Sequence, residues 1–371
     1  IPQTVNEAYG KILNKSKDPA KAKRLLHIIM AAKRPLSVEE LSLALAVDKK
    51  IKSSESFREN VEPPQRFRST LRDMCGLILV VVDDKVYPLH QTVKEFLVPG
   101  TSDNLPSDSL NSEYPSKWRN SLSPAQSNKV LAETLTWYLD CDCTEIGLDI
   151  LLDYATSFWH HHFRDAFPCD ENDMSTMGCR ICAPNSEFQT RFFGEKAGLD
   201  FPQNPDTLMA ASSLGLESVV RQLLSNKSIE VDSKDSMDRT PLYWAASQGY
   251  DAIIKLLLET NKLDPDSKDS RGQTPLHGAA WNGYESTVKL LLETNKVDPD
   301  SKDSVGQTPL YRAAEDGYDA VVKLLLNTGK VDIEARASES GLTAYEVAEQ
   351  HGRLSTMALL ERYMTAGQTV I

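Results

Sequence analysis

Cysteine and histidine are the residue types in this chain whose spacing could build a metal site. Cys179 and Cys182 are separated by two residues, the gap that zinc knuckles use to bring two thiolates onto one tetrahedral ion. Further ligands could come from Cys141, Cys143, Cys169 and the run His160-His161-His162. No second pair with this gap occurs, and the candidates belong to different predicted elements. We therefore expect reduced thiols and no cofactor, with zinc at Cys179 and Cys182 as the alternative.

Patterns that carry catalysis or nucleotide binding are absent from the sequence. It holds no G-x-x-x-x-G-K-S/T phosphate loop, no G-x-S-x-G elbow, no H-E-x-x-H and no G-x-G-x-x-G after a predicted strand. The many carboxylates fall in predicted turns and on predicted helix surfaces, where water solvates them. The sequence predicts a protein that is not an enzyme, with a hydrolase centred on residues 140–200 as the alternative.

The size of the chain, 371 residues, predicts two or three domains because one core of that size is rare. Hydrophobic residues make up 40% of it and charged residues 25%, which is typical of globular proteins. No apolar run reaches the ~20 residues that span a bilayer, so we expect a cytoplasmic protein without membrane contact. The start, Ile-Pro-Gln-Thr-Val, has neither an initiator Met nor a signal-peptide core, and we expect a fragment of a longer polypeptide.

The net charge of −12 is unevenly distributed along the chain. Residues 1–100 hold 17 Lys and Arg against 12 Asp and Glu, whereas the remainder holds 24 against 41. The acidic remainder disfavours nucleic acid as its ligand and favours a basic protein partner.

One short pattern recurs through the last two-fifths of the chain. Its copies are Asp206-Thr-Leu-Met-Ala-Ala, Thr240-Pro-Leu-Tyr-Trp-Ala-Ala, Thr274-Pro-Leu-His-Gly-Ala-Ala, Thr308-Pro-Leu-Tyr-Arg-Ala-Ala and Thr343-Ala-Tyr-Glu-Val-Ala. The copies are closed by Gly215, Gly249, Gly283, Gly317 and Gly352, at spacings of 34, 34, 34 and 35 residues. This period with a T-P-L-H-x-A core is typical of a helix-turn-helix solenoid, and it resembles the ankyrin repeat.

Each position of the pattern has a physical reason. Leu276, Ala279 and Ala280 share one face of a first helix, because they lie at i, i+3 and i+4. The proline suits the first turn of that helix, and the closing glycine ends it in a left-handed conformation. A second apolar helix follows in each copy. Since one repeat cannot bury its own apolar face, we predict an α-solenoid of five repeats over residues 203–365, with the terminal repeats as caps.

Positions that vary within the pattern lie at the hairpin tips and at the exposed end of each first helix. Repeat proteins hold other proteins on this extended concave face. The predicted partner-binding residues are Met237, Arg239, Ser247, Gln248, Arg271, Gln273, Trp281, Asn282, Val305, Gln307, Glu315 and Asp316. Trp281 is the strongest candidate anchor, since aromatic side chains dominate interface hot spots. The alternative is that its ring lies flat on Tyr284 or a neighbouring tip and contacts nothing foreign.

The first hundred residues predict a winged-helix domain, because three helices are followed by a β-hairpin. The helices are expected at Asp18–Ala32, after the capping box Ser37-Val-Glu-Glu40, and at about Arg66–Met74; the strands are Leu77–Val82 and Lys85–Leu89, joined at Asp83-Asp84. Arg66, Arg68 and Arg72 fall on the third helix at helical intervals. A DNA-contacting regulator is therefore an alternative function.

Residues 101–202 are predicted to be a helical spacer with surface loops. The segment 99–127 is rich in Ser, Pro, Asn and Asp, which favours a surface excursion. Two longer helices are expected at about Pro124–Leu139 and Ile146–Arg164, each with an apolar stripe. We expect the spacer to bury the upstream end of the repeats, whose apolar face would otherwise meet water.

Three segments resemble the region that follows the nucleotide-binding NACHT module in fungal NLR-like proteins. They are Val5-Asn-Glu-Ala-Tyr-Gly-Lys-Ile-Leu, Pro35-Leu-Ser-Val-Glu-Glu-Leu and Tyr87-Pro-Leu-His-Gln-Thr-Val-Lys-Glu-Phe-Leu, and the helix from Leu151 resembles the spacer of the same family. That family has the domain order predicted here. The resemblance implies a non-catalytic interaction and signal-relay fragment of an intracellular receptor, with a missing upstream NACHT module and a protein ligand on the repeats.

His90 matches a histidine that, in the wider class of nucleotide-switch ATPases, can lie near the β-phosphate of the bound nucleotide. A neutral imidazole can donate a hydrogen bond to a phosphate oxygen. The resemblance therefore implies nucleotide sensing at His90 in the full-length protein. The alternative is a histidine at a helix start that bonds a nearby carbonyl.

Overall fold

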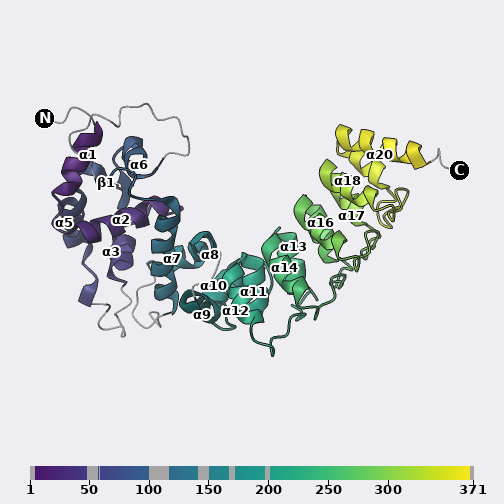
Figure 1. Ribbon diagram of the computed structural model, residues 1–371, viewed down its shortest axis with the longest axis horizontal. Coiled ribbons are helices and arrows are strands. Elements are labelled where there is room, and N and C mark those ends of the chain that lie inside the picture. The colour runs from purple at the N-terminus through teal and green to yellow at the C-terminus, as the bar shows by residue number, and fades with distance from the viewer. Residues whose placement is uncertain are drawn as a thin grey trace. The chain divides into compact units, whose positions relative to one another are not determined.

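The computed structural model describes residues 5–47, 57, 59–99, 117–140, 150–166, 172–196 and 201–367. The chain divides into two compact units, residues 1–177 and 178–371 (Figure 1). The described part is mainly helical, as predicted, and its one sheet has two strands. None of its helices combines the length and the apolar character needed to cross a membrane.

The first unit begins with helices that enclose a small apolar core. They are α1 (Val5–Asn14), α2 (Pro19–Ala31), α3 (Val38–Ala46), α5 (Pro64–Cys75), the short 3-10 helix η1 (Gly76–Ile78) and α6 (Gln91–Leu97). The predicted capping box opens α3, since Ser37 Oγ accepts from the Glu40 backbone N–H at 3.0 Å and the Glu40 carboxylate accepts from Ser37 N–H at 2.6 Å. Leu25, Leu41 and Phe67 are buried between these helices.

The wing is the antiparallel pair β1 (Leu79–Val82) and β2 (Lys85–Pro88). Asp83 and Asp84 both have positive φ, 47° and 63°, as the tightest hairpin turn requires. Val86 N–H donates to Leu36 O at 3.0 Å, so the segment before α3 lies along the other side of β2. Leu77 and Ile78, predicted as strand, belong instead to η1, where Gly76 with φ 60° turns the chain out of α5.

Two longer helices follow in the first unit. They are α7 (Pro124–Asp140), which packs on α2, and α8 (Leu152–Ala166), which packs on α7. The predicted start of α8 at Ile146 lies outside the described residues. Trp159 fastens the pair, because its ring is buried and its indole N–H donates to Thr136 Oγ1 at 2.9 Å.

Two helices that the sequence analysis did not predict lead into the repeats: α9 (Asn172–Ile181) and α10 (Glu187–Lys196). Phe192 of α10 stacks against Phe188 and meets Phe201 edge-on, with ring centroids 5.3 and 5.1 Å apart. The buried Gln189 side chain donates to Pro205 O at 2.6 Å. In the second unit, α10 thus contacts the chain where the first repeat begins.

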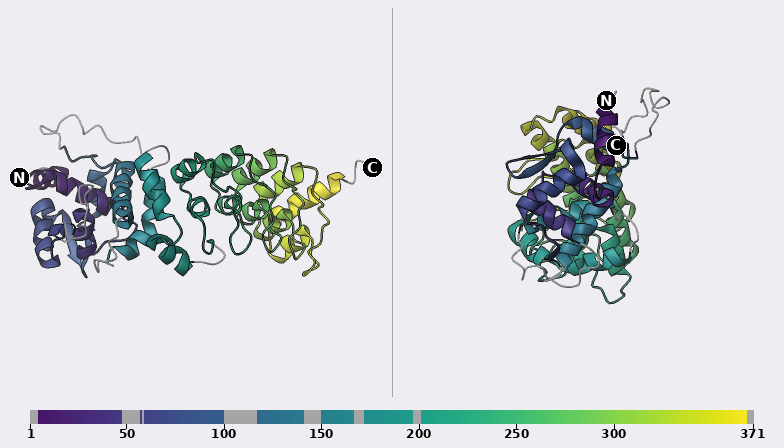
Figure 2. Two further views of the ribbon diagram at one scale, coloured as in Figure 1. Left: turned by 90° about the horizontal axis from the view of Figure 1, so that it is seen from below. Right: turned by 90° about the vertical axis from the view of Figure 1, so that its left-hand side faces the viewer.

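The repeats are five pairs of antiparallel helices in two layers (Figures 1 and 2). The first helices are α11 (Thr207–Leu214), α13 (Pro241–Ser247), α15 (Pro275–Trp281), α17 (Pro309–Asp316) and α19 (Ala344–Gln350); the second are α12 (Glu217–Leu224), α14 (Asp251–Glu259), α16 (Glu285–Glu293), α18 (Asp319–Asn327) and α20 (Leu354–Gly367). Each helix contacts its counterpart in the next repeat. The predicted apolar stripes, such as Val288 and Leu291, lie inside this stack.

The closing glycine of a repeat has a second role besides ending the first helix. Gly283 has φ 72°, and a Cβ placed on it would lie 2.6 Å from the ring of Tyr318 in the next repeat. Gly249 meets Tyr284 in the same way at 2.7 Å. Glycine is therefore needed both for the left-handed backbone and for the close approach of the neighbouring ring.

Candidate protein-binding face of the repeats

The hairpins between repeats are shaped by an aspartate that recurs every 34 residues. Asp235 Oδ1 accepts from the N–H groups of the residues two and four positions later at 2.8 and 2.9 Å. Asp269 does so at 2.9 and 2.8 Å, and Asp303 at 3.0 and 2.8 Å. This pattern is the Asx turn that short acidic side chains favour. Three hairpin tips consequently have the same shape.

Backbone hydrogen bonds join each tip to the next. Ser270 N–H donates to Met237 O, Ser304 N–H to Arg271 O and Ser338 N–H to Val305 O, at 2.8, 2.8 and 2.7 Å. The predicted tip residues Met237, Arg271 and Val305 therefore stand in one row. Arg271 is exposed, and the other two are half-buried.

Arg239 and Gln273, predicted to face a partner, are buried instead, with 4% and 5% of their surface exposed. Arg239 Nε donates to Asp269 Oδ2 of the next hairpin at 3.3 Å, and its guanidinium lies 5.0 Å from the centre of the Trp244 ring. Gln273 Oε1 accepts from Tyr243 O–H at 3.3 Å. The prediction is wrong for these two residues, because their side chains turn along the stack and join neighbouring repeats.

The residue after the Thr-Pro-Leu motif also joins repeats. His277 Nδ1 accepts from Thr274 N–H at 3.1 Å, so its Nε2–H donates to Gln307 O of the next hairpin at 3.2 Å. Burial lowers the pKa of His277 to about 4, which keeps the ring neutral at physiological pH. Tyr311, at the equivalent position, bonds Ser340 Oγ at 3.3 Å.

Trp281 lies at the end of α15 with 40% of its surface exposed. The guanidinium carbon of Arg312, on the next first helix, is 4.1 Å from the ring centroid, which is a close cation–π contact. Arg312 is itself held by Glu315 at 3.4 Å and Asp303 at 3.6 Å. The group that packs on the indole is therefore the guanidinium of Arg312, and not Tyr284 or a hairpin tip.

Sequence reasoning missed Arg312, although the signal was present. Trp244, Gly278 and Arg312 occupy the same position of the repeat, and this position varies within a constant pattern as the predicted positions do. Gly278 is buried, and a Cβ on it would lie 3.2 Å from Ser247 Cβ, so packing accounts for that glycine. Arg312 alone of the three touches Trp281.

The remaining predicted residues lie around Trp281 or along the neighbouring repeats. Asn282 is exposed, and its side-chain amide donates to Gly278 O at 3.0 Å. Asp316 pairs with Arg353 at 3.7 Å. Those that are half-buried are Met237, Ser247, Gln248, Val305, Gln307, Glu315 and Asp316.

Three free cysteines lie in the described part of the chain: Cys75 and Cys182 are buried, and Cys179 is half-buried. Burial raises the pKa of Cys179 to about 11 and that of Cys75 to about 12, and it raises the pKa of Cys182 as well. Burial thus favours the protonated form of these thiols. No three metal-ligating side chains gather within the part of the chain that the structure describes. Cys141, Cys143 and Cys169 lie outside that part.

The histidine run lies within residues 140–200, where the hydrolase alternative has its centre, and its last member, His162, contributes to packing. Tyr154 O–H accepts from Lys33 N–H and bonds His162 Nε2, both at 3.0 Å, and His162 Nδ1 bonds Asn128 Oδ1 at 2.9 Å. Burial, with Lys33 and His161 nearby, lowers the pKa of His162 to about 3. The neutral ring thus bridges helices of the first unit.

His90 precedes α6 and caps it, since Nδ1 accepts from Thr92 N–H at 3.2 Å. The predicted helix-start position is confirmed, but the partner is an N–H and not a carbonyl. The side chain is exposed, and Nε2 has no partner among the described residues.

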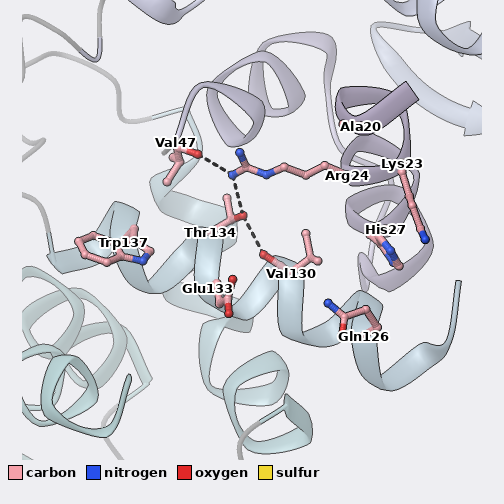
Figure 3. Close-up of a pocket in the computed structure, with 10 residues that line it drawn as sticks. All are labelled: Ala20, Lys23, Arg24, His27, Val47, Gln126, Val130, Glu133, Thr134 and Trp137. Atoms are coloured by element: carbon pink, nitrogen blue, oxygen red, sulfur yellow. Dashed lines mark hydrogen bonds between the residues drawn. The ribbon is translucent and has the colours of Figure 1, made fainter. Parts of the chain in front are cut away.

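A cleft of about 590 Å³ lies between α2 and α7 of the first unit (Figure 3). On one side of the cleft, Arg24 Nη2 donates to Val47 O at 2.5 Å and to Thr134 Oγ1 at 3.3 Å. The Thr134 hydroxyl in turn donates to Val130 O at 2.8 Å. These polar groups bind one another and join the two helices. We therefore place the candidate site in the repeats.

Two family profiles match the chain. Residues 207–303 and 294–366 match the profile described as ankyrin repeats in three copies. Residues 207–366 are an ankyrin-repeat stack. Residues 9–114 match the profile described as the winged helix domain of GPI inositol-deacylase, in agreement with the helices and wing of the first unit. An ankyrin stack is a protein-interaction module.

The chain is also similar to vegetative incompatibility protein HET-E-1 of Podospora anserina, with 30% identity over 107 residues. The match covers 28% of this chain and 7% of that protein. The chain thus corresponds to a small part of the length of this relative.

Proposed function

We propose that this chain is the non-catalytic interaction and signal-relay part of an intracellular NACHT-type receptor. Its winged-helix domain (1–100) and spacer (101–202) would connect an upstream NACHT module to ankyrin repeats (203–365) that recognise a protein ligand on their concave face. The proposal is supported by the order of winged helix and ankyrin repeats and by the similarity to a fungal incompatibility protein.

The observation that carries the proposed ligand site is the ordered indole of Trp281. Arg312 holds one side of the ring at 4.1 Å, while 40% of the residue remains exposed. An aromatic group that is already ordered loses less side-chain entropy when a partner covers it. The next residue, Asn282, is exposed, and Arg271 is exposed on the hairpin that precedes α15. The acidic balance of the chain after residue 100 favours a basic ligand.

Site-specific photocrosslinking in cells tests this proposal. A photoreactive phenylalanine analogue at position 281 should trap one protein, whereas the same group at Lys289, exposed on the second helix α16, should not. Trp281→Ala with Arg271→Ala should leave the melting temperature nearly unchanged and weaken binding of the trapped protein by at least about tenfold. Equal trapping from both positions would contradict the assignment of the face.

The proposed role of His90 needs the full-length receptor. His90→Asn keeps a side chain that can cap α6, whereas His90→Ala removes the cap as well. If Nε2 donates to a nucleotide phosphate, both variants should weaken ADP binding to the same extent. Normal ADP affinity in His90→Asn would show that His90 only caps α6 and does not bind the nucleotide.

A further inference from the structure

The wing of the first unit has one free strand edge among the described residues. β2 pairs with β1 on one side and meets the segment of Leu36 on the other, which leaves β1 at the edge. Val82 pairs with Lys85 next to the turn, and Leu89 N–H donates to Ile78 O at 2.8 Å. Hydrogen-bonded pairs alternate along an antiparallel ladder, so Leu79 and Val81 direct their N–H and C=O groups away from β2.

A groove of about 280 Å³ follows this edge, with α5 as its other wall. It is lined by Arg68, Leu71, Arg72, Gly76, Leu77, Leu79, Val80 and Val81. Leu71 is buried, whereas Leu77 at one end has 75% of its surface exposed. A strand edge beside a helix is the geometry in which an extended peptide can add to a sheet.

The groove carries positive charge from α5. Arg68 reaches the wing turn, where Nη2 lies 2.6 Å from Asp84 Oδ1. Arg72, one turn further along α5, is exposed and has no partner among the described residues. Asp73, the next residue in the sequence, pairs with Lys17 at 2.7 Å. Arg72 is thus the cation available to a ligand in the groove.

We propose that this groove binds an extended acidic segment of another protein, which adds to β1 as a third strand. The outward N–H and C=O groups of Leu79 and Val81 would pair with the backbone of the segment. Arg72 would bind a carboxylate, and Leu77 would be covered by an apolar side chain. A second copy paired through the same edge would bring like charges together at Arg72, so charge complementarity favours the acidic segment.

Fluorescence anisotropy with synthetic peptides tests the proposal on the whole chain. The probe is a fluorescein-labelled decapeptide of alternating Val and Glu, and its counterpart has Lys in place of Glu. The acidic probe should bind, and Arg72→Glu should weaken it by about tenfold or more while improving the Lys probe. Arg66→Glu, on the same helix but outside the groove, should change little.

N-methylation of the probe tests the strand ladder without altering the protein. Only alternate N–H groups of an added strand face β1. Methylating one alternate set should therefore abolish binding, whereas methylating the other set should not. Unchanged melting temperatures of both arginine variants confirm that they fold.

Three outcomes would overturn this inference. Equal binding of the two N-methylated isomers would show that no ladder forms. Binding of a labelled DNA duplex, but not of the peptide, with loss in Arg72→Glu would make the surface a nucleic-acid contact. A concentration-dependent dimer in sedimentation velocity that Arg72→Glu changes, without peptide binding, would assign the edge to a second copy.

Discussion

The two units hold their helices together through different kinds of polar contact. In the second unit the same contact between repeats recurs every 34 residues, as the backbone bonds from Ser270, Ser304 and Ser338 to the preceding hairpin show. In the first unit the polar contacts between helices differ from one another, and one of them is a chain of hydrogen bonds through Tyr154 and His162. A repeated contact fastens one junction, whereas this chain of hydrogen bonds ties together segments distant in sequence. Substitutions should therefore act locally in the stack and broadly in the first unit.

The largest effect is expected at the buried ion pair between repeats. Asp269→Ala leaves the buried guanidinium of Arg239 without its carboxylate, which should cost about 3–5 kcal/mol of unfolding free energy. Asp235→Ala is the matched control, because its second oxygen accepts only the indole N–H of Trp244, at 3.0 Å, and it should cost about 1–3 kcal/mol. Urea unfolding measures both variants.

A second substitution tests whether the charge causes that loss. Arg239→Leu added to Asp269→Ala should recover part of the stability, since no unpaired charge then remains buried. An additive further loss would show that the hairpin turn, and not the ion pair, holds the junction.

The contact between neighbouring rings and glycines comes next. Gly283→Ala places a Cβ 2.6 Å from Tyr318 at a left-handed residue, whereas Gly352→Ala meets nothing within 4 Å at the equivalent position. Gly352→Ala should cost about 1 kcal/mol from backbone strain, and Gly283→Ala about 2–4 kcal/mol. Thermal unfolding compares the two. Equal losses would mean that the ring moves aside freely.

A smaller effect is expected from the hydrogen-bond chain through Tyr154 and His162 in the first unit. Tyr154→Phe removes the hydroxyl that bonds both Lys33 N–H and His162 Nε2, which should cost about 1–3 kcal/mol. Hydrogen exchange should quicken in α7 and α8 and stay unchanged in the repeats. Faster exchange spread through the repeats would contradict the difference between the units.

The smallest effect concerns pH and Asp266. Burial raises the pKa of Asp266 to about 6 from its ordinary 3.8, and its Oδ1 is buried without a hydrogen-bond partner. The folded chain therefore favours the protonated carboxyl; this stabilisation is full below pH 3.8 and is lost as the pH rises through about 6. Asp266→Asn should raise the melting temperature by about 2 °C above pH 7, and the difference from the parent should vanish near pH 4.

The experiment compares the melting temperatures of Asp266→Asn and the parent chain, because buried histidines change stability with pH in the direction opposite to Asp266. Burial lowers the pKa of His277 to about 4, so its contribution is present above its ordinary value of 6.5 and is lost as the pH falls toward 4. Both proteins contain His277, and its effect cancels. If the two melting temperatures differ by the same amount at every pH, titration of the Asp266 carboxyl is not the cause.

Periodicity made much of the fold predictable. The motif placed each first helix within one or two residues, and the glycines at its end have the left-handed backbone that was expected. The capping box at Ser37 and the turn at Asp83 and Asp84 were readable because local chemistry decides them. Helices α9 and α10 were missed, since each has only 10 residues, which leaves a short apolar stripe, and neither belongs to the repeated motif.

The candidate site was less predictable, for a physical reason. Arg239 and Arg271 occupy nearby places in the hairpin, yet one is buried and the other exposed. Their difference depends on where the next repeat offers a carboxylate, as Asp269 does for Arg239. The spacing of residues within one hairpin does not show which side chains reach the next repeat.

The bonds that join one hairpin tip to the next have a consequence for how such a chain can change over time. The segments 255–276 and 289–310 are nearly the same in sequence, and both end at equivalent junctions. Duplication, loss or exchange of one whole 34-residue module would therefore recreate the seams on either side. Recombination could alter which ligand is recognised in a single step, carrying Arg271, Trp281 and Asn282 together to another place in the array.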